Sequence, residues 1–148
     1  MKQINIGING FGRIGRTLFR LLSEQPHLKV VAINDLADAP TLSHLLKYDS
    51  IHGVFQKEVS HSKNHIIVEN SKVALLNHKS PKDIPWSDYK VDIVVEATGK
   101  FKDRDILGEH LKNGAKKVIL SVELNRPILP LFTPTLQTRV CTTNLIRI

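Results

Sequence analysis

Three glycines near the N-terminus have the spacing of a loop that holds a phosphate group. The stretch "INIGINGFGRIGR" at residues 4–16 places Gly10, Gly12 and Gly15 in the order G-x-G-x-x-G. In this arrangement the first glycine permits a tight turn, the second lets a pyrophosphate approach the backbone, and the third lets a helix pack on the preceding strand. The glycines therefore predict a dinucleotide site, although the same spacing also occurs by chance in glycine-containing loops.

An acidic residue follows at the distance expected for a ribose-binding group. Asp35 ends the apolar run "LKVVAIND" at residues 28–35, about 20 residues after Gly15. A carboxylate at this point accepts hydrogen bonds from ribose hydroxyls and repels a 2′-phosphate, which favours NAD over NADP. The alternative is that Asp35, next to Asn34, caps the segment that follows.

The segments on either side of the glycine turn fit a strand followed by a helix. Before the turn, isoleucine alternates with asparagine and glycine, at Ile4, Ile6 and Ile8, which is the period of a strand. After the turn, apolar residues recur at helical spacing, at Ile14, Leu18, Leu21 and Leu22. Because this helix would begin at the glycines, its N-terminus is placed to hold a phosphate.

The middle of the chain predicts a helix and then a small antiparallel insertion. Pro40 suits the first turn of a helix that carries leucines on one face and ends near residue 48. Three strands are expected from "VFQKEVS", "HIIVEN" and "KVALLNH", at residues 54–60, 65–70 and 72–78. The proline-rich connection that follows carries Trp86, which is expected to pack it against the core.

A later strand and turn repeat the arrangement of the first. The apolar run at residues 91–95 leads into Glu96, Thr98 and Gly99, and a helix and a strand that ends at Ser121 follow. Ligands of doubly wound sheets lie outside the carboxyl ends of the strands, so the turn at Thr98 should face the same crevice as the glycines. Acidic residues suit the start of the helix, and its buried face should be apolar: Asp103 and Asp105, and Ile106, Leu107 and Leu111.

The residues after Ser121 have a different character. Prolines stand at 127, 130 and 134, and the apolar residues follow neither the strand nor the helix period for long. The stretches "ILPLF" and "TRVCTT" at 128–132 and 138–143 are candidates for short edge strands, since Pro130 cannot donate a hydrogen bond within a central ladder. We therefore divide the chain into a domain at 1–121 and a divergent tail at 122–148.

Composition excludes several classes of protein. The 148 residues are 41% hydrophobic and 24% charged, which fits one cytoplasmic domain, and no run suggests a membrane span or a secretory leader. A single cysteine and the absence of histidines at metal-ligand spacing argue against disulfides and a metal site. The net charge of +7 comes from scattered residues and aromatics make up only 5%, which argues against nucleic-acid binding as the main function.

Together, several motifs resemble the NAD-binding half of glyceraldehyde-3-phosphate dehydrogenase. They are "INGFGRIGR", "VVAINDL", "HLLKYDSIHG", "IPW", "VDIVVEATGKF" and "GAKKVILS", which follow in order from residue 4 to Ser121. Erythrose-4-phosphate dehydrogenase, a near relative, has the same layout. The resemblance implies an α/β fold with a doubly wound parallel sheet of the Rossmann type, NAD as cofactor and a place in glycolysis. It also implies that the family's substrate domain is absent from these residues.

The resemblance assigns roles to individual residues. The backbone amides of Arg13 and Ile14 would meet the pyrophosphate, and Asp35 would hold the adenosine ribose. Lys79 falls near the adenine, where the family commonly has an arginine. Thr98 and Gly99 would line the crevice, and Ser121 would lie near the nicotinamide end. For Thr98 and Ser121 the alternative is an ordinary hydroxyl at the end of a strand.

Cys141 stands in "CTTN", which resembles the family's catalytic cysteine motif. In the family, the thiolate attacks glyceraldehyde 3-phosphate, the hemithioacetal gives a hydride to NAD, and inorganic phosphate releases an acyl phosphate. A thiolate needs a histidine base or a helix N-terminus. Here "QTRV" precedes the cysteine, the stretch after Ser121 is several residues short, and none of the seven histidines lies in a matching motif. The alternative is that Cys141 is a remnant.

Two functions follow from these observations. The first is the NAD-binding part of a phosphorylating glyceraldehyde-3-phosphate dehydrogenase that, as this chain alone, binds NAD and turns over little or no aldehyde. The second is a non-catalytic dinucleotide-binding or interaction module that forms a homo-oligomer or associates with full-length subunits. The apolar residues available for such a contact are Ile128, Leu129, Leu131 and Phe132.

Overall fold

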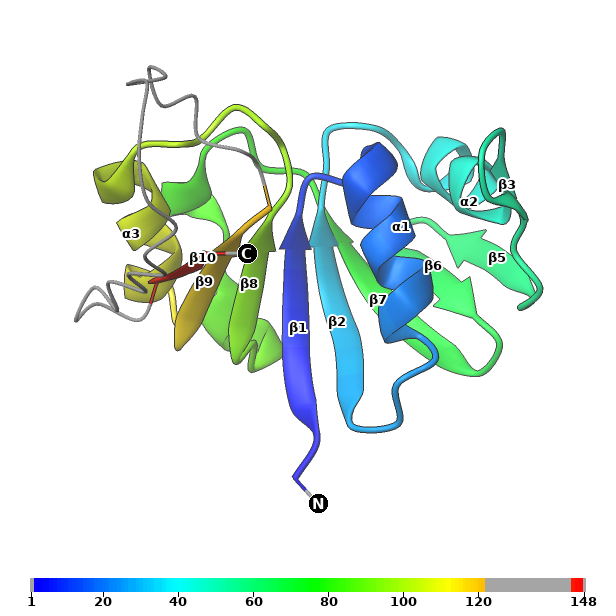
Figure 1. The fold of residues 1–148 in the computed structure, drawn as a ribbon, viewed down its shortest axis with the longest axis horizontal. Coiled ribbons are helices and arrows are strands. Elements are labelled where there is room, and N and C mark those ends of the chain that lie inside the picture. The colour runs from blue at the N-terminus through cyan, green and yellow to red at the C-terminus, as the bar shows by residue number, and fades with distance from the viewer. Residues whose placement is uncertain (1, 122–144, 148) are drawn as a thin grey trace, which may run out of the picture.

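An eight-stranded sheet runs through the centre of the molecule. The computed structural model describes residues 2–121 and 145–147. The strand order is β10-β9-β8-β1-β2-β7-β6-β5 (Figure 1). The strands of this sheet are β1 (Ile4–Asn9), β2 (Leu28–Asn34), β5 (Val59–Ser62), β6 (His65–Val68), β7 (Ser71–Leu76), β8 (Ile93–Glu96), β9 (Lys117–Leu120) and β10 (Leu145–Arg147). The other elements are α1 (Arg13–Leu22), α2 (Ala39–Lys47), α3 (Arg104–Lys112), the 3-10 helices η1 (Pro81–Asp83) and η2 (Trp86–Tyr89), and the small hairpin of β3 (Tyr48–Asp49) and β4 (Gly53–Val54).

The connectivity of the sheet confirms the doubly wound α/β class. From β1 the chain moves outward to β2 and β7, and then crosses back to place β8 on the other side of β1. The pairs β2–β7, β1–β2, β1–β8, β8–β9 and β9–β10 are all parallel. The carboxyl ends of these strands therefore share one edge, which is the upper edge in Figure 1. The order reverses between β1 and β8, and ligands of doubly wound sheets bind at this reversal.

The antiparallel insertion continues the main sheet. Strands β5 and β6 pair in antiparallel fashion, and β6 pairs likewise with β7, which is itself parallel to β2. The strand expected over residues 54–60 was wrong in position, because Val54 belongs to β4 and only Val59 and Ser60 lie in β5. The reason is that Phe55 turns inward, with 6% of its surface exposed, and so interrupts the run.

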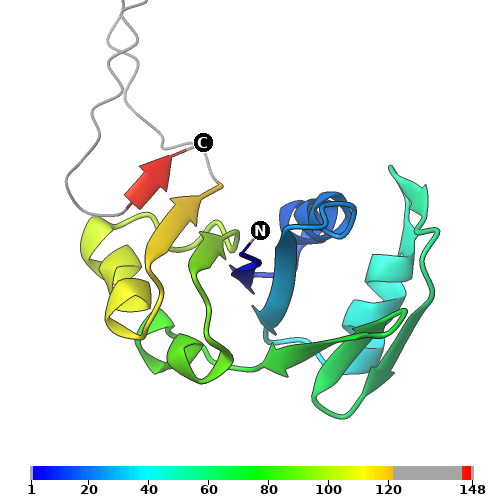
Figure 2. The same cartoon turned by 90° about the horizontal axis from the view of Figure 1, so that it is seen from below.

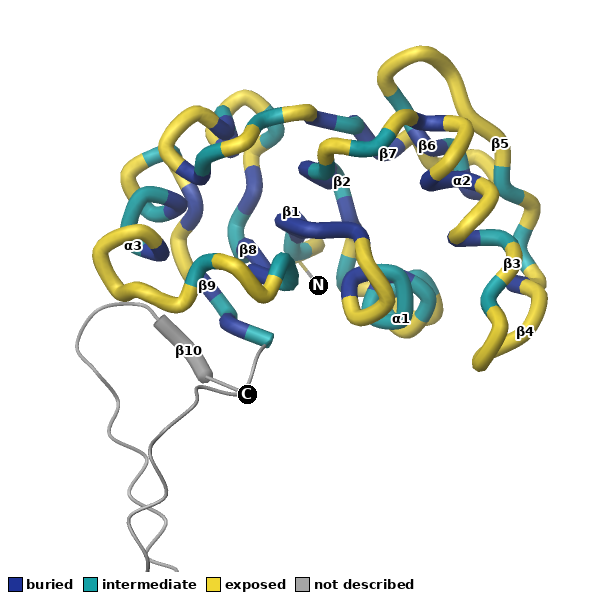
Figure 3. Tube along the Cα trace, turned by 90° about the horizontal axis from the view of Figure 1, so that it is seen from above, coloured by how far each residue is buried: buried dark blue, intermediate teal, exposed yellow. Residues whose placement is uncertain are grey.

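Each face of the sheet carries its own hydrophobic core. On one face, Phe19 of α1 and Leu42 and Leu46 of α2 pack with residues of β1, β2 and β6. On the other face, Trp86 of η2 and Leu107 of α3 pack with residues of β8 and β9. Figure 2 shows α1 and α3 on opposite sides of the sheet, and Figure 3 shows the buried strands between them. Trp86 is fully buried, which confirms its expected role in packing the proline-rich connection.

The helix after the glycine turn is confirmed, but part of its predicted apolar face was wrong. Ile14 and Leu21 are 50% and 63% exposed, whereas Phe19 is 3% exposed. Gly15 decides the orientation, because a Cβ there would overlap the carbonyl oxygen of Gly10. With Gly15 against the end of β1, the residues three and four positions along the helix turn inward, so Leu18 and Phe19 join the core.

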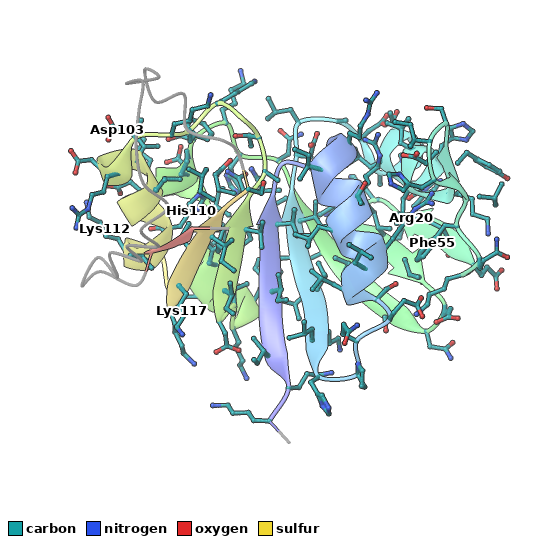
Figure 4. The ribbon with its side chains drawn as sticks, in the orientation of Figure 1. Arg20, Phe55, Asp103, His110, Lys112 and Lys117 are labelled. Atoms are coloured by element: carbon teal, nitrogen blue, oxygen red, sulfur yellow. The ribbon has the colours of Figure 1, made fainter. Side chains whose placement is uncertain are left out.

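The helix α3 also differs from its predicted face. Leu107 is buried as expected, but Ile106 is 40% exposed and His110 has no exposed surface. His110 projects toward the strands (Figure 4), where its ring nitrogens meet the Glu96 carboxylate and the Trp86 indole. A histidine satisfied on both ring nitrogens can occupy a core position that hydrophobicity assigns to an apolar residue.

Arg20 ties α1 to the segment between α2 and β5. Its guanidinium carbon lies 5.2 Å from the centroid of the Phe55 ring, a cation–π contact that Figure 4 shows. The same guanidinium donates to the carbonyl oxygens of Leu46 and Gly53 at 2.7 and 3.1 Å. These contacts fix the β3–β4 hairpin beside the first helix.

The last strand lies at the edge of the sheet. β10 pairs in parallel with β9, with Leu145 opposite Val118. The edge strands predicted over 128–132 and 138–143, and the apolar contact residues among them, lie outside the described residues. Within the part that the structure describes, no helix is long and apolar enough to cross a membrane.

Candidate functional site

A crevice of about 260 Å³ opens at the carboxyl edge of the sheet. It lies where the turns after β1, β2, β7 and β8 meet, and so at the reversal of strand order. Its lining is Asn9, Gly10, Gly12, Asn34, Asp35, Leu36, His78, Lys79, Ala97, Thr98, Lys100 and Phe101. The structure therefore brings together five of the residues that the sequence assigned to cofactor binding, which are Gly10, Gly12, Asp35, Lys79 and Thr98.

Two of the three glycines are required by the protein itself. Gly10 has a φ of +94°, and a Cβ there would lie 2.7 Å from the amide nitrogen of Thr98. Gly15 lies in the first turn of α1, where a Cβ would overlap the carbonyl oxygen of Gly10. The first glycine thus brings the turns after β1 and β8 together, and the third seats the helix on the strand.

Gly12 has no such requirement. Its φ is −74°, which any residue adopts, and no atom of the described chain lies within 4 Å of a Cβ built on it. Gly12 lines the crevice, so a side chain would project into space that the protein leaves open. An open space in front of a backbone that needs no glycine fits a bulky ligand that must approach closely, as a pyrophosphate does.

The start of α1 lies at this space and has no side-chain cap within the described part of the chain. Gly12 is the N-cap residue, no side chain caps the helix, and its first turn holds no acidic residue. The first amides of an α-helix have no partner within the helix, and the helix dipole makes this end positive. Arg13 and Ile14 are the first two helical residues, so their amides belong to this end of the helix. Neither residue lines the crevice, and a pyrophosphate contact for them stays a prediction.

Asp35 joins the turn after β2 to the glycine turn. Its Oδ2 accepts a hydrogen bond from the Phe11 amide at 2.7 Å, and its Oδ1 accepts one from the Ala37 amide at 3.0 Å. The N-cap of α2 is Asp38, which accepts from the Thr41 amide at 3.0 Å, so Asp35 is not the cap of this helix. Each carboxylate oxygen of Asp35 keeps a further lone pair that can accept from a ribose hydroxyl.

Two lysines give the crevice an excess of positive charge. Lys79 follows β7 and Lys100 follows β8, and both line the crevice together with the single carboxylate of Asp35. Positive side chains around a concave site raise the local concentration of anionic ligands. With the uncapped helix, these lysines favour a ligand that carries phosphate groups.

Five sequence-assigned residues do not line the crevice, and a sixth, Cys141, is outside the described chain: the five are Arg13, Ile14, Gly15, Gly99 and Ser121. Gly99 follows Thr98 with a φ of +73°, yet it does not line the crevice. Ser121 follows β9, and its amide and hydroxyl both donate to the Glu96 carbonyl, at 3.1 and 3.0 Å. This is how an ordinary hydroxyl at the end of a strand behaves, so a cofactor contact for Ser121 stays a prediction. Cys141 lies outside the described residues.

Sequence reasoning missed a set of buried polar residues at the base of the crevice, where Asn9 and Asn34 line it. Asn9, Asn34 and Glu96 are 1%, 4% and 0% exposed, and each is the last residue of its strand. Asn9 is the register partner of both Asn34 and Glu96 on the neighbouring strands. The signal in the sequence was a pattern shared by three strands: in each, an apolar run ends in a polar residue.

Comparison with known proteins agrees with this geometry. Residues 4–104 match the family described as glyceraldehyde 3-phosphate dehydrogenase, NAD binding domain. The glyceraldehyde-3-phosphate dehydrogenase of Geobacillus stearothermophilus is 49% identical over 118 residues, which cover 80% of this chain and 35% of that protein. Glyceraldehyde-3-phosphate dehydrogenase 2 of Bacillus subtilis is 51% identical over 119 residues, again 80% of this chain and 35% of the relative.

The matched region covers most of this chain but only a minor part of each relative. A Mycoplasma pneumoniae glyceraldehyde-3-phosphate dehydrogenase is 48% identical over 120 residues, which are 81% of this chain and 36% of that protein. The chain thus spans about a third of the length of the curated relatives it matches. Because the family model covers more than half of the chain, the chain belongs to the glyceraldehyde-3-phosphate dehydrogenase family, of which it carries the NAD-binding domain.

Proposed function

We propose that this chain binds NAD in the crevice, with the pyrophosphate in front of Gly12 and at the N-terminus of α1. The amides of Arg13 and Ile14 would donate hydrogen bonds to the phosphate oxygens. The observation that carries the proposal is that neither the backbone conformation nor the packing of the protein requires a glycine at position 12. Among the described residues, no atom lies within 4 Å of a Cβ at Gly12, and the helix that begins there has no side-chain cap.

Asp35 sets the choice between the two nicotinamide dinucleotides in this proposal. Its carboxylate lines the crevice and is held in place by the amides of Phe11 and Ala37. The remaining lone pairs can accept from the hydroxyls of the adenosine ribose, whereas a 2′-phosphate would meet a negative charge. NAD is therefore preferred over NADP.

The reaction served by this site would be the phosphorylating oxidation of glyceraldehyde 3-phosphate. NAD, when bound, accepts the hydride that the oxidation of the aldehyde releases. Cys141 is our candidate nucleophile, and its thiolate would require a base. None of the seven histidines lies in a motif that resembles the family's base. We therefore expect the 148 residues alone to bind NAD without oxidising the aldehyde.

Calorimetric titration tests the binding proposal. NAD should bind the wild-type chain saturably, NADP should bind at least about tenfold more weakly, and Asp35→Ala should lose most of the difference. Asp38→Ala is the matched control, because it removes the same charge from an aspartate that does not line the crevice. Equal binding of the two dinucleotides by the wild type, or an effect of Asp38→Ala as large as that of Asp35→Ala, would contradict the role of Asp35.

A turnover assay tests the catalytic part separately. The chain is mixed with NAD, glyceraldehyde 3-phosphate and inorganic phosphate, and NADH is followed by its absorbance. We expect no steady production of NADH. Steady production that disappears in Cys141→Ala would show that Cys141 is competent within these residues and would overturn this part of the proposal.

A further inference from the structure

A continuous chain of buried polar side chains runs from η2 and α3 to the turn after β7 and reaches the crevice at Asn9 and Asn34. It begins with Trp86 and His110, passes through Glu96 and Asn9, and ends at Asn34. All five residues are at most 4% exposed. Buried polar groups are costly unless each finds a partner, so a network of this length constrains the elements that contribute to it.

Glu96 lies at the centre of this network and is surrounded by donors. Its Oε2 lies 2.6 Å from Asn9 Nδ2 and 2.9 Å from His110 Nε2. Its Oε1 lies 3.0 Å from the Thr98 amide and 2.5 Å from the Thr98 hydroxyl. Each oxygen therefore faces at least one N–H group, which can only donate. The carboxyl group acts as an acceptor at both oxygens.

The orientation of the His110 ring follows from its neighbours. The Trp86 indole can only donate, and its Nε1 lies 2.9 Å from His110 Nδ1, so Nδ1 accepts. The proton of the neutral ring then lies on Nε2 and points at Glu96. Trp86 thus supports Glu96, through His110, from the end of the network that does not line the crevice.

On the other side, the network holds two turns of the crevice wall. Thr98 is held by the Glu96 carboxylate through both its amide and its hydroxyl. Asn9 accepts from Asn34 Nδ2 at 2.8 Å, and Asn34 in turn clamps the backbone of His78, with its Oδ1 2.8 Å from the amide and its Nδ2 2.9 Å from the carbonyl oxygen. The turns after β8 and β7 are therefore connected through one carboxylate.

We propose that Glu96 is a positioning residue of the dinucleotide crevice. Its carboxylate holds the turn at Thr98 and, through Asn9 and Asn34, the turn at His78, in the arrangement that the ligand needs. The inference rests on the proposed function for the identity of the ligand, while the positioning itself is a property of the chain. Glu96 does not line the crevice, so it acts through the residues it holds.

Glu96→Gln tests the proposal because the side chain keeps its size. Either orientation of the glutamine amide points its NH₂ group at an N–H donor, which is Thr98 N on one side and Asn9 Nδ2 with His110 Nε2 on the other. We expect the dissociation constant for NAD to rise at least about tenfold in calorimetry at a temperature where the variant is folded. A value within about twofold of the wild type would overturn the proposal.

Trp86→Phe is the matched control for a merely structural role. It removes the hydrogen bond to His110 at the remote end of the network and leaves every donor to Glu96 in place. Both variants should melt at lower temperature than the wild type, but only Glu96→Gln should weaken NAD binding. A loss of affinity that simply follows the loss of melting temperature in both variants would contradict positioning.

A second pair of variants serves if Glu96→Gln does not fold. Thr98→Ser keeps the hydroxyl that Glu96 holds, and Thr98→Val replaces it with a methyl group. Because Thr98 itself lines the crevice, this pair is read without ligand: the amide at position 98 should keep its protection from hydrogen exchange in the serine variant and lose part of it in the valine variant. Equal protection in the two variants would count against the proposal.

A measurement without ligand separates this inference from the proposed function. If the wild type binds no NAD, the proposed function fails, but amide hydrogen exchange still tests the positioning. The Thr98 amide donates a hydrogen bond to Glu96, and the His78 amide donates one to Asn34. These hydrogen bonds should slow the exchange of both amides. They should exchange faster in Glu96→Gln and at the wild-type rate in Trp86→Phe. Unchanged exchange in Glu96→Gln would overturn the inference.

Discussion

The helices α1 and α3 begin at the same edge of the sheet, but their first turns are completed in different ways. Each follows a parallel strand, β1 or β8, on opposite faces. The start of α3 is capped by Asp103, which accepts from the Asp105 amide at 2.8 Å and is labelled in Figure 4. The start of α1 has Gly12 at the N-cap position and no side-chain cap.

The difference is what the proposed anion site at the start of α1 requires. The helix α2 is also capped by an aspartate, Asp38, so among the three α-helices of the described chain only α1 begins without a capping side chain. An aspartate at Gly12 would cap the first amides and would also place a negative charge where we propose the phosphate. The cap is omitted at the one helix start that lines the crevice.

The largest effect should come from adding a methyl group where α1 touches β1. Gly15→Ala places a Cβ against the Gly10 carbonyl oxygen. We expect the free energy of unfolding, measured by chemical denaturation, to fall by about 2 kcal/mol, even after the gain in helix propensity. The matched control is Gly108→Ala in α3, where no atom of the described residues lies within 4 Å of a Cβ. That variant should gain up to about 1 kcal/mol, and a loss of similar size at both sites would break the comparison.

The next effect should come from giving α1 the cap that α3 has. Gly12→Asp has room for its side chain and an extended backbone that suits an N-cap. The free energy of unfolding should change by only about a few tenths of a kcal/mol. The affinity for NAD should fall by at least about tenfold. Gly12→Ala adds bulk without charge or a cap and should weaken binding less. Unchanged affinity in Gly12→Asp would contradict a pyrophosphate at this helix start.

Removing the cap of α3 should do the opposite. Asp103→Ala deletes the acceptor for the Asp105 amide, which should cost about 1 kcal/mol of stability in denaturation experiments. Asp103 does not line the crevice, so NAD affinity should stay at the wild-type value. A loss of NAD affinity in a folded Asp103→Ala variant would mean that the two helix starts are not independent.

The smallest effect should be the loss of stability at low pH when Asp38, the N-cap of α2, becomes protonated. Hydrogen bonds from the Thr41 hydroxyl and, to a smaller extent, the Thr41 amide lower the pKa of Asp38 below its usual value of 3.8. Because the pKa is lower in the folded chain, this stabilisation is present above about pH 4 and is lost as pH falls through the folded pKa. The melting temperature of Asp38→Asn should therefore fall less steeply in this acid range than that of the wild type. Identical slopes would contradict the assignment.

The sequence predicted those parts of the fold that depend on local pattern. The glycine turn, the strand before it and the helix after it follow from period and spacing. The start of α3 near Asp103 and Asp105 follows from acidic residue type, whereas the hydrogen bond by which Asp103 caps it was not predicted. The buried face of α1 was partly missed, because Ile14 and Leu21 fit the helical period as well as Phe19 does. The contact of Gly15 with Gly10, which decides between them, is made only in the folded chain.

The polar network was missed for a related reason. Glu96 and His110 are charged or polar residue types that hydrophobicity assigns to the surface, and each is fully buried here because the folded chain gives it partners. His110 bonds to Glu96 and Trp86, and Glu96 also accepts from Asn9 and Thr98. Glu96 and His110 are separated by a turn and most of a helix, so no local pattern connects them. Register across the sheet, which pairs Asn9 with Asn34 and Glu96, is likewise a property of the folded molecule.

The most direct test of the open helix start is an amide NMR titration of the chain with NAD. The amides of Arg13 and Ile14 should shift most strongly and saturate with the same dissociation constant as calorimetry gives. The Asp105 amide, already bonded to Asp103 at the start of α3, should move far less. Saturable binding of NAD that leaves Arg13 and Ile14 unchanged would contradict the account, because the ligand would then lie elsewhere.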